Sequence, residues 1–126
     1  MIPIHILSVA AGGALGSVCR HLISVAALKL LGGSFPWGTL AVNATGSFAM
    51  GAFIAYLTRF GGDVALRLAV ATGFLGGFTT YSTFSLEVVV LYERGQPALA
   101  AAYIAASILL SLAGIAAGLS LVRTIT

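Results

Sequence analysis

The chain has 126 residues, of which 60% are hydrophobic and only 7% are charged. A soluble domain carries about 25% charged residues, so this composition excludes a water-soluble protein and predicts an integral membrane protein with a single domain over residues 1–126. The net charge of +3 comes from bases scattered along the chain, which favours contact with lipid over binding of nucleic acid. A single cysteine, Cys19, excludes an internal disulfide.

Four apolar runs are each long enough to cross the hydrocarbon core of a membrane, which takes about 20 residues. They are predicted at residues 4–31, 37–58, 64–92 and 97–122. An even number of spans places both termini on one side of the membrane. The sequence therefore predicts an all-α fold of four transmembrane helices.

The charges near the ends of these spans give almost no orientation signal. The side with the termini holds Arg59, Arg67 and Arg123, and the opposite side holds Lys29 and Arg94. So small an excess permits insertion in both directions, and two subunits could then pair antiparallel. The alternative, that one extra charge is enough to fix a single orientation, stays open.

The first span carries a close-packing signal followed by a charge. Gly12 and Gly16 have the small-xxx-small spacing that lets two helices approach closely. Arg20 follows one turn later, and an arginine within a span is costly unless it reaches the interface, water or a partner. Arg20 either marks the end of the buried segment or supplies a positive charge to a watery vestibule.

The second span places two polar side chains on one face. Thr39 and Asn43 are spaced i, i+4. Asn43 lies about two turns into the span, so its amide must be hydrogen-bonded. It either joins helices, as polar side chains often do in membranes, or contacts a pore or substrate. Gly46 and Gly51 add a small face for close packing.

The third span contains the least helical stretch of the chain, residues 73–84. Three glycines within five residues weaken the helix by about 1 kcal/mol each, and hydroxyl and aromatic side chains follow at once. Irregular backbone at membrane depth is tolerated only when it is buried in protein or lines a cavity. The stretch is either a broken helix at a site or a packing kink. Further on, Glu87 shares a face with Thr80 and Thr83, and it either reaches the interface, accepts hydrogen bonds from hydroxyls or carries protons.

The fourth span is rich in alanine and leucine, and a hydroxyl stripe interrupts it. Tyr103, Ser107 and Ser111 stand at i, i+4 and i+8 on one face. Gly114 and Gly118 form a second close-packing pair. The stripe predicts a polar track along this helix.

Taken together, three segments resemble the Fluc or CrcB family of small bacterial fluoride channels, and the likeness extends over the whole chain. The motifs that carry it are Gly12-Gly13-x-x-Gly16-x-x-x-Arg20, Pro36-Trp37-Gly38-Thr39-Leu40-x-x-Asn43-x-x-Gly46 and Gly73-x-x-Gly76-Gly77-Phe78-Thr79-Thr80-Tyr81-Ser82-Thr83-Phe84.

The resemblance implies a passive, fluoride-selective channel in the bacterial cytoplasmic (inner) membrane, a multi-pass protein that exports fluoride from the cell. It implies a dual-topology antiparallel homodimer and no enzymatic activity. It also implies a structural sodium ion that is not transported. The backbone carbonyls of Gly76 and Thr79 would hold this ion where the third helix is broken.

The resemblance also implies which side chains meet fluoride. The expected pore residues are Asn43, Tyr81, Phe84, Ser107 and Ser111. Further members of the polar track are expected among Thr39, Ser82, Thr83, Glu87 and Tyr103, with Arg20 as a vestibule charge. Fluoride is strongly hydrated, so N–H, O–H and positive ring edges must replace its water. The family usually has phenylalanine where this chain has Tyr81. The added hydroxyl either narrows the path, donates to fluoride or points away.

Three other classes fit less well. Small four-span drug exporters need a carboxylate in the first helix, whereas this chain has Arg20 there and Glu87 is its only acid within a span. A non-transporting assembly subunit would explain the glycine pairs and leave the polar stripe without a role. An enzyme is not expected, because no convergent set of histidine, acid and nucleophile is present.

Overall fold

The computed structural model describes residues 2–126, which are helical almost throughout. In chain order the elements are α1 (Ile2–Leu31), α2 (Trp37–Phe60), α3 (Val64–Arg67), the π-helix η1 (Leu68–Leu75), α4 (Gly76–Phe78), α5 (Tyr81–Glu93) and α6 (Pro97–Ile125). Elements α3 to α5 follow one another as a single interrupted rod. Counting this rod once, the described chain has four helices long and apolar enough to cross a membrane. The four predicted spans are confirmed, each within about one helical turn at its ends.

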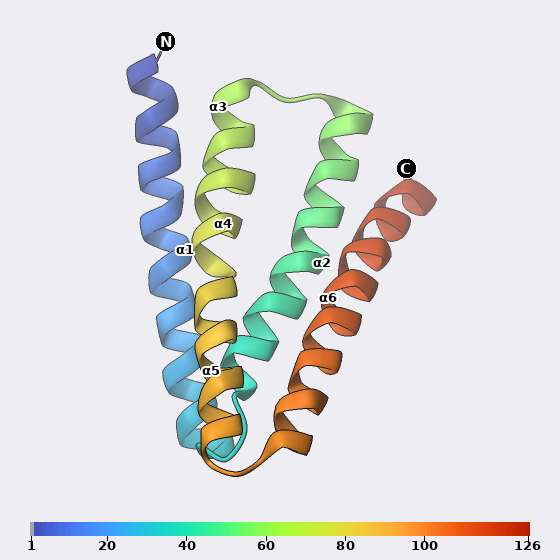
Figure 1. Cartoon of the computed structure of the whole chain (residues 1–126). Coiled ribbons are helices and arrows are strands. Elements are labelled where there is room, and N and C mark those ends of the chain that lie inside the picture. The colour runs from blue at the N-terminus through green and yellow to red at the C-terminus, as the bar shows by residue number, and fades with distance from the viewer. Residues whose placement is uncertain (1) are drawn as a thin grey trace.

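The helices form two packed pairs (Figure 1). Helix α1 lies along the third rod, chiefly against η1, and α2 lies along α6. Both termini and the connection between α2 and α3 lie at one end of the bundle, and the other two connections lie at the opposite end. Helices α2 and α6 therefore run in the same direction, and the predicted placement of both termini on one side is confirmed.

Glycines let α1 approach the third rod backbone to backbone. A Cβ atom added to Gly12 would collide with the carbonyl oxygen of Ala69, and one added to Gly16 would collide with that of Phe74. Only a residue without a side chain fits at this distance, as is common between membrane helices. The packing role predicted for this glycine pair is confirmed.

The second helix pair packs by the same device. A Cβ on Gly118 of α6 would collide with the carbonyl oxygen of Phe48 in α2, and one on Gly114 would lie 2.9 Å from that of Ala44. From the other side, a Cβ on Gly51 would meet the backbone of α6 at Ile115. These close contacts fix α2 and α6 as one unit.

The third rod is broken, as predicted. The break was expected from Gly76 to Thr79, and the residues with extended backbone are Thr79 and Thr80, the last residue of that interval and the one after it. Residues Gly76–Phe78 are helical, whereas Thr79 (φ −88°, ψ 157°) and Thr80 (φ −152°, ψ 119°) are extended. Glycine weakens a helix without ending it, and the new helix begins where a threonine can cap it. The sequence did not predict the eight-residue π-helix before the break, although π-turns often occur beside functional sites.

Few side chains are fully buried, and the buried cluster lies towards the end of the bundle that carries the connection between α5 and α6. It consists of Leu40, Phe84, Leu91, Ala100 and Tyr103. Large apolar side chains instead cover the outside of α1 and α6. This arrangement is the reverse of a soluble protein, and it suits a bundle surrounded by lipid.

Candidate ion pathway

The break in the third rod is held by one side chain from α2. Asn43 Nδ2 donates to the carbonyl oxygen of Thr80 at 3.0 Å, and the Thr80 N–H donates to Asn43 Oδ1 at 2.7 Å. Asn43 thus pairs both backbone groups that the break releases at this residue. One N–H of the amide has no partner within residues 2–126, so Asn43 joins helices and still offers a donor.

Thr80 also begins the next helix. Its Oγ1 accepts from the N–H of Thr83 at 3.3 Å and donates to Thr83 Oγ1 at 3.1 Å. These bonds make Thr80 the N-cap of α5 and satisfy one of the amide groups that a helix start leaves free. Thr83 is therefore engaged in the cap.

The break leaves several carbonyl oxygens without helical partners, and only one of them accepts a hydrogen bond from elsewhere in the described chain. The carbonyl of Gly77 accepts from Arg20 Nε at 3.0 Å. No N–H or O–H in the described part of the chain donates to the carbonyls of Gly76, Phe78 or Thr79. Two of these three oxygens are the ones predicted to bind sodium, and they remain able to accept.

Arg20 lies at this break and not at the end of its helix. Helix α1 continues to Leu31, and the side chain reaches across to the carbonyl of Gly77. Arg20 is half-buried. Arg20 therefore has a polar partner at the break, and both alternatives for it, the end of the buried segment and a vestibule charge, stay open.

A pocket of about 400 Å³, here called the central pocket, opens beside the break. It brings together all five side chains predicted to meet fluoride: Asn43 from α2, Tyr81 and Phe84 from α5, and Ser107 and Ser111 from α6. The remaining wall consists of Gly46, Ser47, Met50, Thr79, Thr80, Ile108, Leu112 and Ile115. The apolar members of this wall were not predicted, because nothing in an apolar span distinguishes a pocket wall from a lipid-facing side.

Ser107 is the one lining residue with a buried polar atom that has no partner. The residue is 6% exposed, and its Oγ makes no hydrogen bond within the described chain. A buried hydroxyl left unpaired costs about 1–3 kcal/mol. Ser107 thus places a buried donor without a geometric hydrogen-bond partner next to the central pocket.

The two rings at the pocket differ in burial. Phe84 is 9% exposed and lies edge-on to Tyr103, with ring centroids 5.2 Å apart. Tyr81 is 80% exposed, and its ring lies 5.6 Å from that of Phe84. Packing therefore fixes Phe84, whereas Tyr81 stands on the surface of the single chain.

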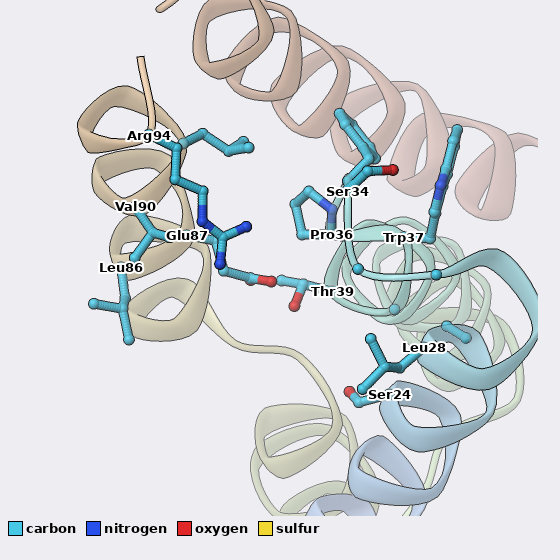
Figure 2. Close-up of a pocket in the computed structure, with 16 residues that line it drawn as sticks. Ser24, Leu28, Ser34, Pro36, Trp37, Thr39, Leu86, Glu87, Val90 and Arg94 are labelled. Atoms are coloured by element: carbon cyan, nitrogen blue, oxygen red, sulfur yellow. The ribbon is translucent and has the colours of Figure 1, made fainter. Parts of the chain in front are cut away.

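A second pocket, the loop-end pocket, has a volume of about 310 Å³ and lies between α1, α2, α5 and the connection before α2. Glu87, Thr39 and Arg94 point into it (Figure 2). Tyr103 donates from its hydroxyl to Glu87 Oε1 at 3.3 Å. Of the alternatives for Glu87, this contact supports an acceptor of hydrogen bonds from hydroxyls.

The predicted polar track is thus divided between two pockets. Thr39 and Glu87 line the loop-end pocket, and Ser107 and Ser111 line the central pocket. Tyr103 is fully buried, bonded to Glu87, and one helical turn from Ser107 along α6. Two further predicted members, Ser82 and Thr83, line neither pocket, and Ser82 is exposed.

Comparison with known families matches residues 7–119 to the model described as CrcB-like protein, Camphor Resistance (CrcB). The chain belongs to the CrcB family. This result confirms the predicted family, and together with the four spans it makes the chain a multi-pass membrane protein.

Relatives that cover nearly the whole of this CrcB protein carry one name, fluoride-specific ion channel FluC. The relative from Rhizobium etli is 52% identical over 97% of this chain and 98% of its own length. The relative from Agrobacterium fabrum is 50% identical over the same shares, and that from Cereibacter sphaeroides is 52% identical over 94% of each chain. The name describes a channel and not an enzyme, in agreement with the prediction.

Sequence reasoning missed two contacts of this CrcB protein, Asn43 with the backbone of Thr80 and Arg20 with the carbonyl of Gly77. Both join residues more than 35 positions apart. A threonine followed three residues later by another hydroxyl could have indicated the cap at Thr80. No comparable signal exists for the partner of Arg20.

Proposed function

We propose that this protein is a fluoride-selective channel through which fluoride leaves the cytoplasm passively across the bacterial inner membrane. The observation that carries the proposal is the buried Ser107 hydroxyl, which has no partner and lines a pocket beside Asn43 and Ser111. The names of the relatives supply the identity of the ion.

The chemistry of the central pocket suits a small, strongly hydrated anion. Ser107 offers an O–H and Asn43 offers its free N–H, while Phe84 and Tyr81 present rings whose edges carry partial positive charge. None of the chain's acidic residues lines the central pocket. A narrow path of such donors replaces the water of fluoride better than that of the larger chloride.

The working unit proposed is an antiparallel homodimer of dual topology. Three observations support it: Tyr81 is 80% exposed, Gly76 is exposed beside free carbonyls, and the central pocket is open in the single chain. Polar groups open to lipid are costly, and a second copy laid against this face would cover them. The near balance of charges at the two ends is compatible with insertion in both directions.

The proposed dimer holds a structural sodium ion that is not transported. The carbonyls of Gly76 and Thr79 are suited to it, because they are free oxygens in an exposed break and sodium is a hard cation that prefers oxygen. Its charge would lower the cost of holding an anion nearby. Arg20, bonded to the neighbouring carbonyl of Gly77, is proposed to add a second positive charge at the vestibule.

The test is efflux from liposomes that contain the purified protein, with fluoride, chloride and a cationic dye as cargoes. We expect fluoride efflux without a proton gradient, far slower chloride efflux and no dye transport. Dye transport driven by protons, with no fluoride flux, would assign the protein to the exporters and reject the channel.

A matched pair of serine variants tests the observation that carries the proposal. Ser107→Ala removes the unpaired donor and is expected to slow fluoride flux roughly tenfold, since a hydrogen bond to a charged group contributes about 1.5–3 kcal/mol. Ser120→Ala, on the exposed side of the same helix, should leave flux unchanged. Equal flux in both variants would remove Ser107 from the path.

A further inference from the structure

A third pocket lies away from the central and loop-end pockets, where α2 and α6 end side by side (Figure 1). It has a volume of about 400 Å³ and is lined by Ala55, Thr58, Arg59, Arg123 and Thr126. We call it the arginine pocket. Each of the two helices contributes one arginine from its last turn.

The arginines keep most of their hydrogen-bonding capacity. An arginine carries five N–H donors, and Arg59 uses one of them, from Nη2 to the carbonyl oxygen of Thr126 at 3.2 Å. Arg123 donates to no acceptor in the described chain. Asp63, Glu87 and Glu93, which are all the acidic residues of the sequence, do not line the pocket. The arginine pocket therefore presents two guanidinium groups with unused donors.

The surroundings place this hollow at the depth of lipid headgroups. Tyr56 and Phe60, both exposed, form a ring pair with centroids 5.0 Å apart in the last turns of α2. Aromatic side chains of this kind gather at the membrane interface. On α6, Leu121 and Ile125 are exposed close to Arg123. A positive site thus adjoins apolar surface on which acyl chains can lie.

We propose that the arginine pocket binds the phosphate of an anionic phospholipid, with Arg59 and Arg123 as the two ligands and the acyl chains along the exposed apolar side chains. Planar guanidinium groups are well suited to phosphate because they can donate two parallel hydrogen bonds. Basic hollows between membrane helices bind such headgroups elsewhere. This site touches neither the central nor the loop-end pocket, so it goes beyond the proposed function.

A purely structural role for the arginines leads to a different result. The C-terminal ends of α2 and α6 carry partial negative charge and lie side by side, and Arg59 and Arg123 would offset that charge without any ligand. In that case, no lipid selectivity is expected.

The experiment is native mass spectrometry of the purified full-length protein with phosphatidylglycerol, phosphatidylcholine or inorganic phosphate. We expect retention of phosphatidylglycerol, little retention of phosphatidylcholine, and no displacement of the lipid by millimolar phosphate. Equal retention of the two lipids would overturn the proposal. Displacement by phosphate would assign the pocket to a soluble phosphate compound and overturn the lipid assignment.

Substitutions locate the binding. Arg59→Gln and Arg123→Gln should each lower the affinity for phosphatidylglycerol about fivefold, and the double variant about 25-fold. Arg67→Gln removes an exposed arginine at the same end of the bundle that does not line the pocket, and should change nothing. Fluoride flux is measured for every variant as a check that the variant is folded. Unchanged lipid retention in a double variant that still conducts fluoride would overturn the proposal.

Discussion

Among single residues, Asn43 combines two roles that the sequence could not separate. Its amide pairs the N–H and the carbonyl of Thr80, and it also lines the central pocket. Asn43 therefore stabilises the break and offers a hydrogen-bond donor at the same place. The geometry of the proposed fluoride path depends on this one side chain. Loss of Asn43 should therefore affect both stability and flux.

Substitution of Asn43 separates its two roles. Asn43→Ala leaves the N–H and carbonyl of Thr80 unpaired, at a cost of about 1–3 kcal/mol for each group, and should abolish most fluoride flux. Asn43→Asp keeps an acceptor for the N–H and loses the donor, so Thr80 keeps one of its two bonds. Thermal unfolding and liposome flux measure the two effects.

Thr45→Val is the control, because Thr45 lies exposed on the same helix and its hydroxyl donates only to the carbonyl of Ala41. It should leave stability and flux near the wild-type values. If Asn43→Ala lowers the stability of the protein and its fluoride flux equals that of the wild-type protein, Asn43 has a packing role and no role in the fluoride path.

At the scale of elements, the third rod is a helix whose break is stabilised from both sides. Asn43 of α2 pairs Thr80, and Arg20 of α1 takes the carbonyl of Gly77. The side chain of Thr79 is also engaged, since its Oγ1 donates to the carbonyl of Leu75 at 2.9 Å. The backbone oxygens of Gly76, Phe78 and Thr79 remain free at the break, and a cation bound there would satisfy them.

Replacement of sodium tests this proposal. If the carbonyls of Gly76 and Thr79 bind sodium in the folded protein, exchange of sodium for choline at constant ionic strength should lower the unfolding temperature and the fluoride flux. A ligand at 100 times its dissociation constant stabilises the folded state by about 2.7 kcal/mol. Scanning calorimetry of the purified protein and liposome efflux give the two readings.

Thr79→Val serves as the matched variant, because a ligand bound by the backbone carbonyl does not need the hydroxyl. Dependence on sodium should persist in Thr79→Val. Identical unfolding temperatures in sodium and choline for the wild-type protein would rule out the structural ion.

For the whole molecule, the bundle has two ends with nearly equal numbers of basic residues. Arg59, Arg67 and Arg123 lie in the last turns of α2, α3 and α6. Lys29 lies in the last turn of α1 and Arg94 follows α5, at the end of the bundle opposite both termini (Figure 1). Large apolar side chains cover much of the outside of the bundle, and the central pocket opens on it beside the exposed Tyr81. This face is therefore the one on which the proposed antiparallel partner would lie.

Labelling of a single cysteine tests the proposed dual topology. In a Cys19→Ala background, Thr126→Cys should react with a membrane-impermeant maleimide in about half of the molecules in intact cells, and in the rest after permeabilisation. Adding Ser34→Arg and Gln96→Arg at the opposite end should shift the reaction towards the outside, since positive loops stay in the cytoplasm. A wild-type chain labelled entirely from one side would contradict dual topology.

Much of the fold was predictable because it depends on local patterns. The lengths of the apolar runs predicted the four spans, and the spacing of Gly12 and Gly16 predicted a close helix contact. The five residues expected at the pore, named from the family motifs, do line one pocket. The π-helix η1 was not predicted, because nothing in its apolar sequence distinguishes it from an α-helix.

The sequence by itself determined that this chain spans a membrane four times, that its third span is interrupted and which family it belongs to, since composition, spacing and motif are local properties. Only the tertiary structure decided where the interruption falls and what secures it. Thr80 could be extended because Asn43, 37 positions earlier, pairs its backbone groups. A broken helix in lipid needs partners for its backbone, and folding alone brings those partners to Thr80 and to the carbonyl of Gly77.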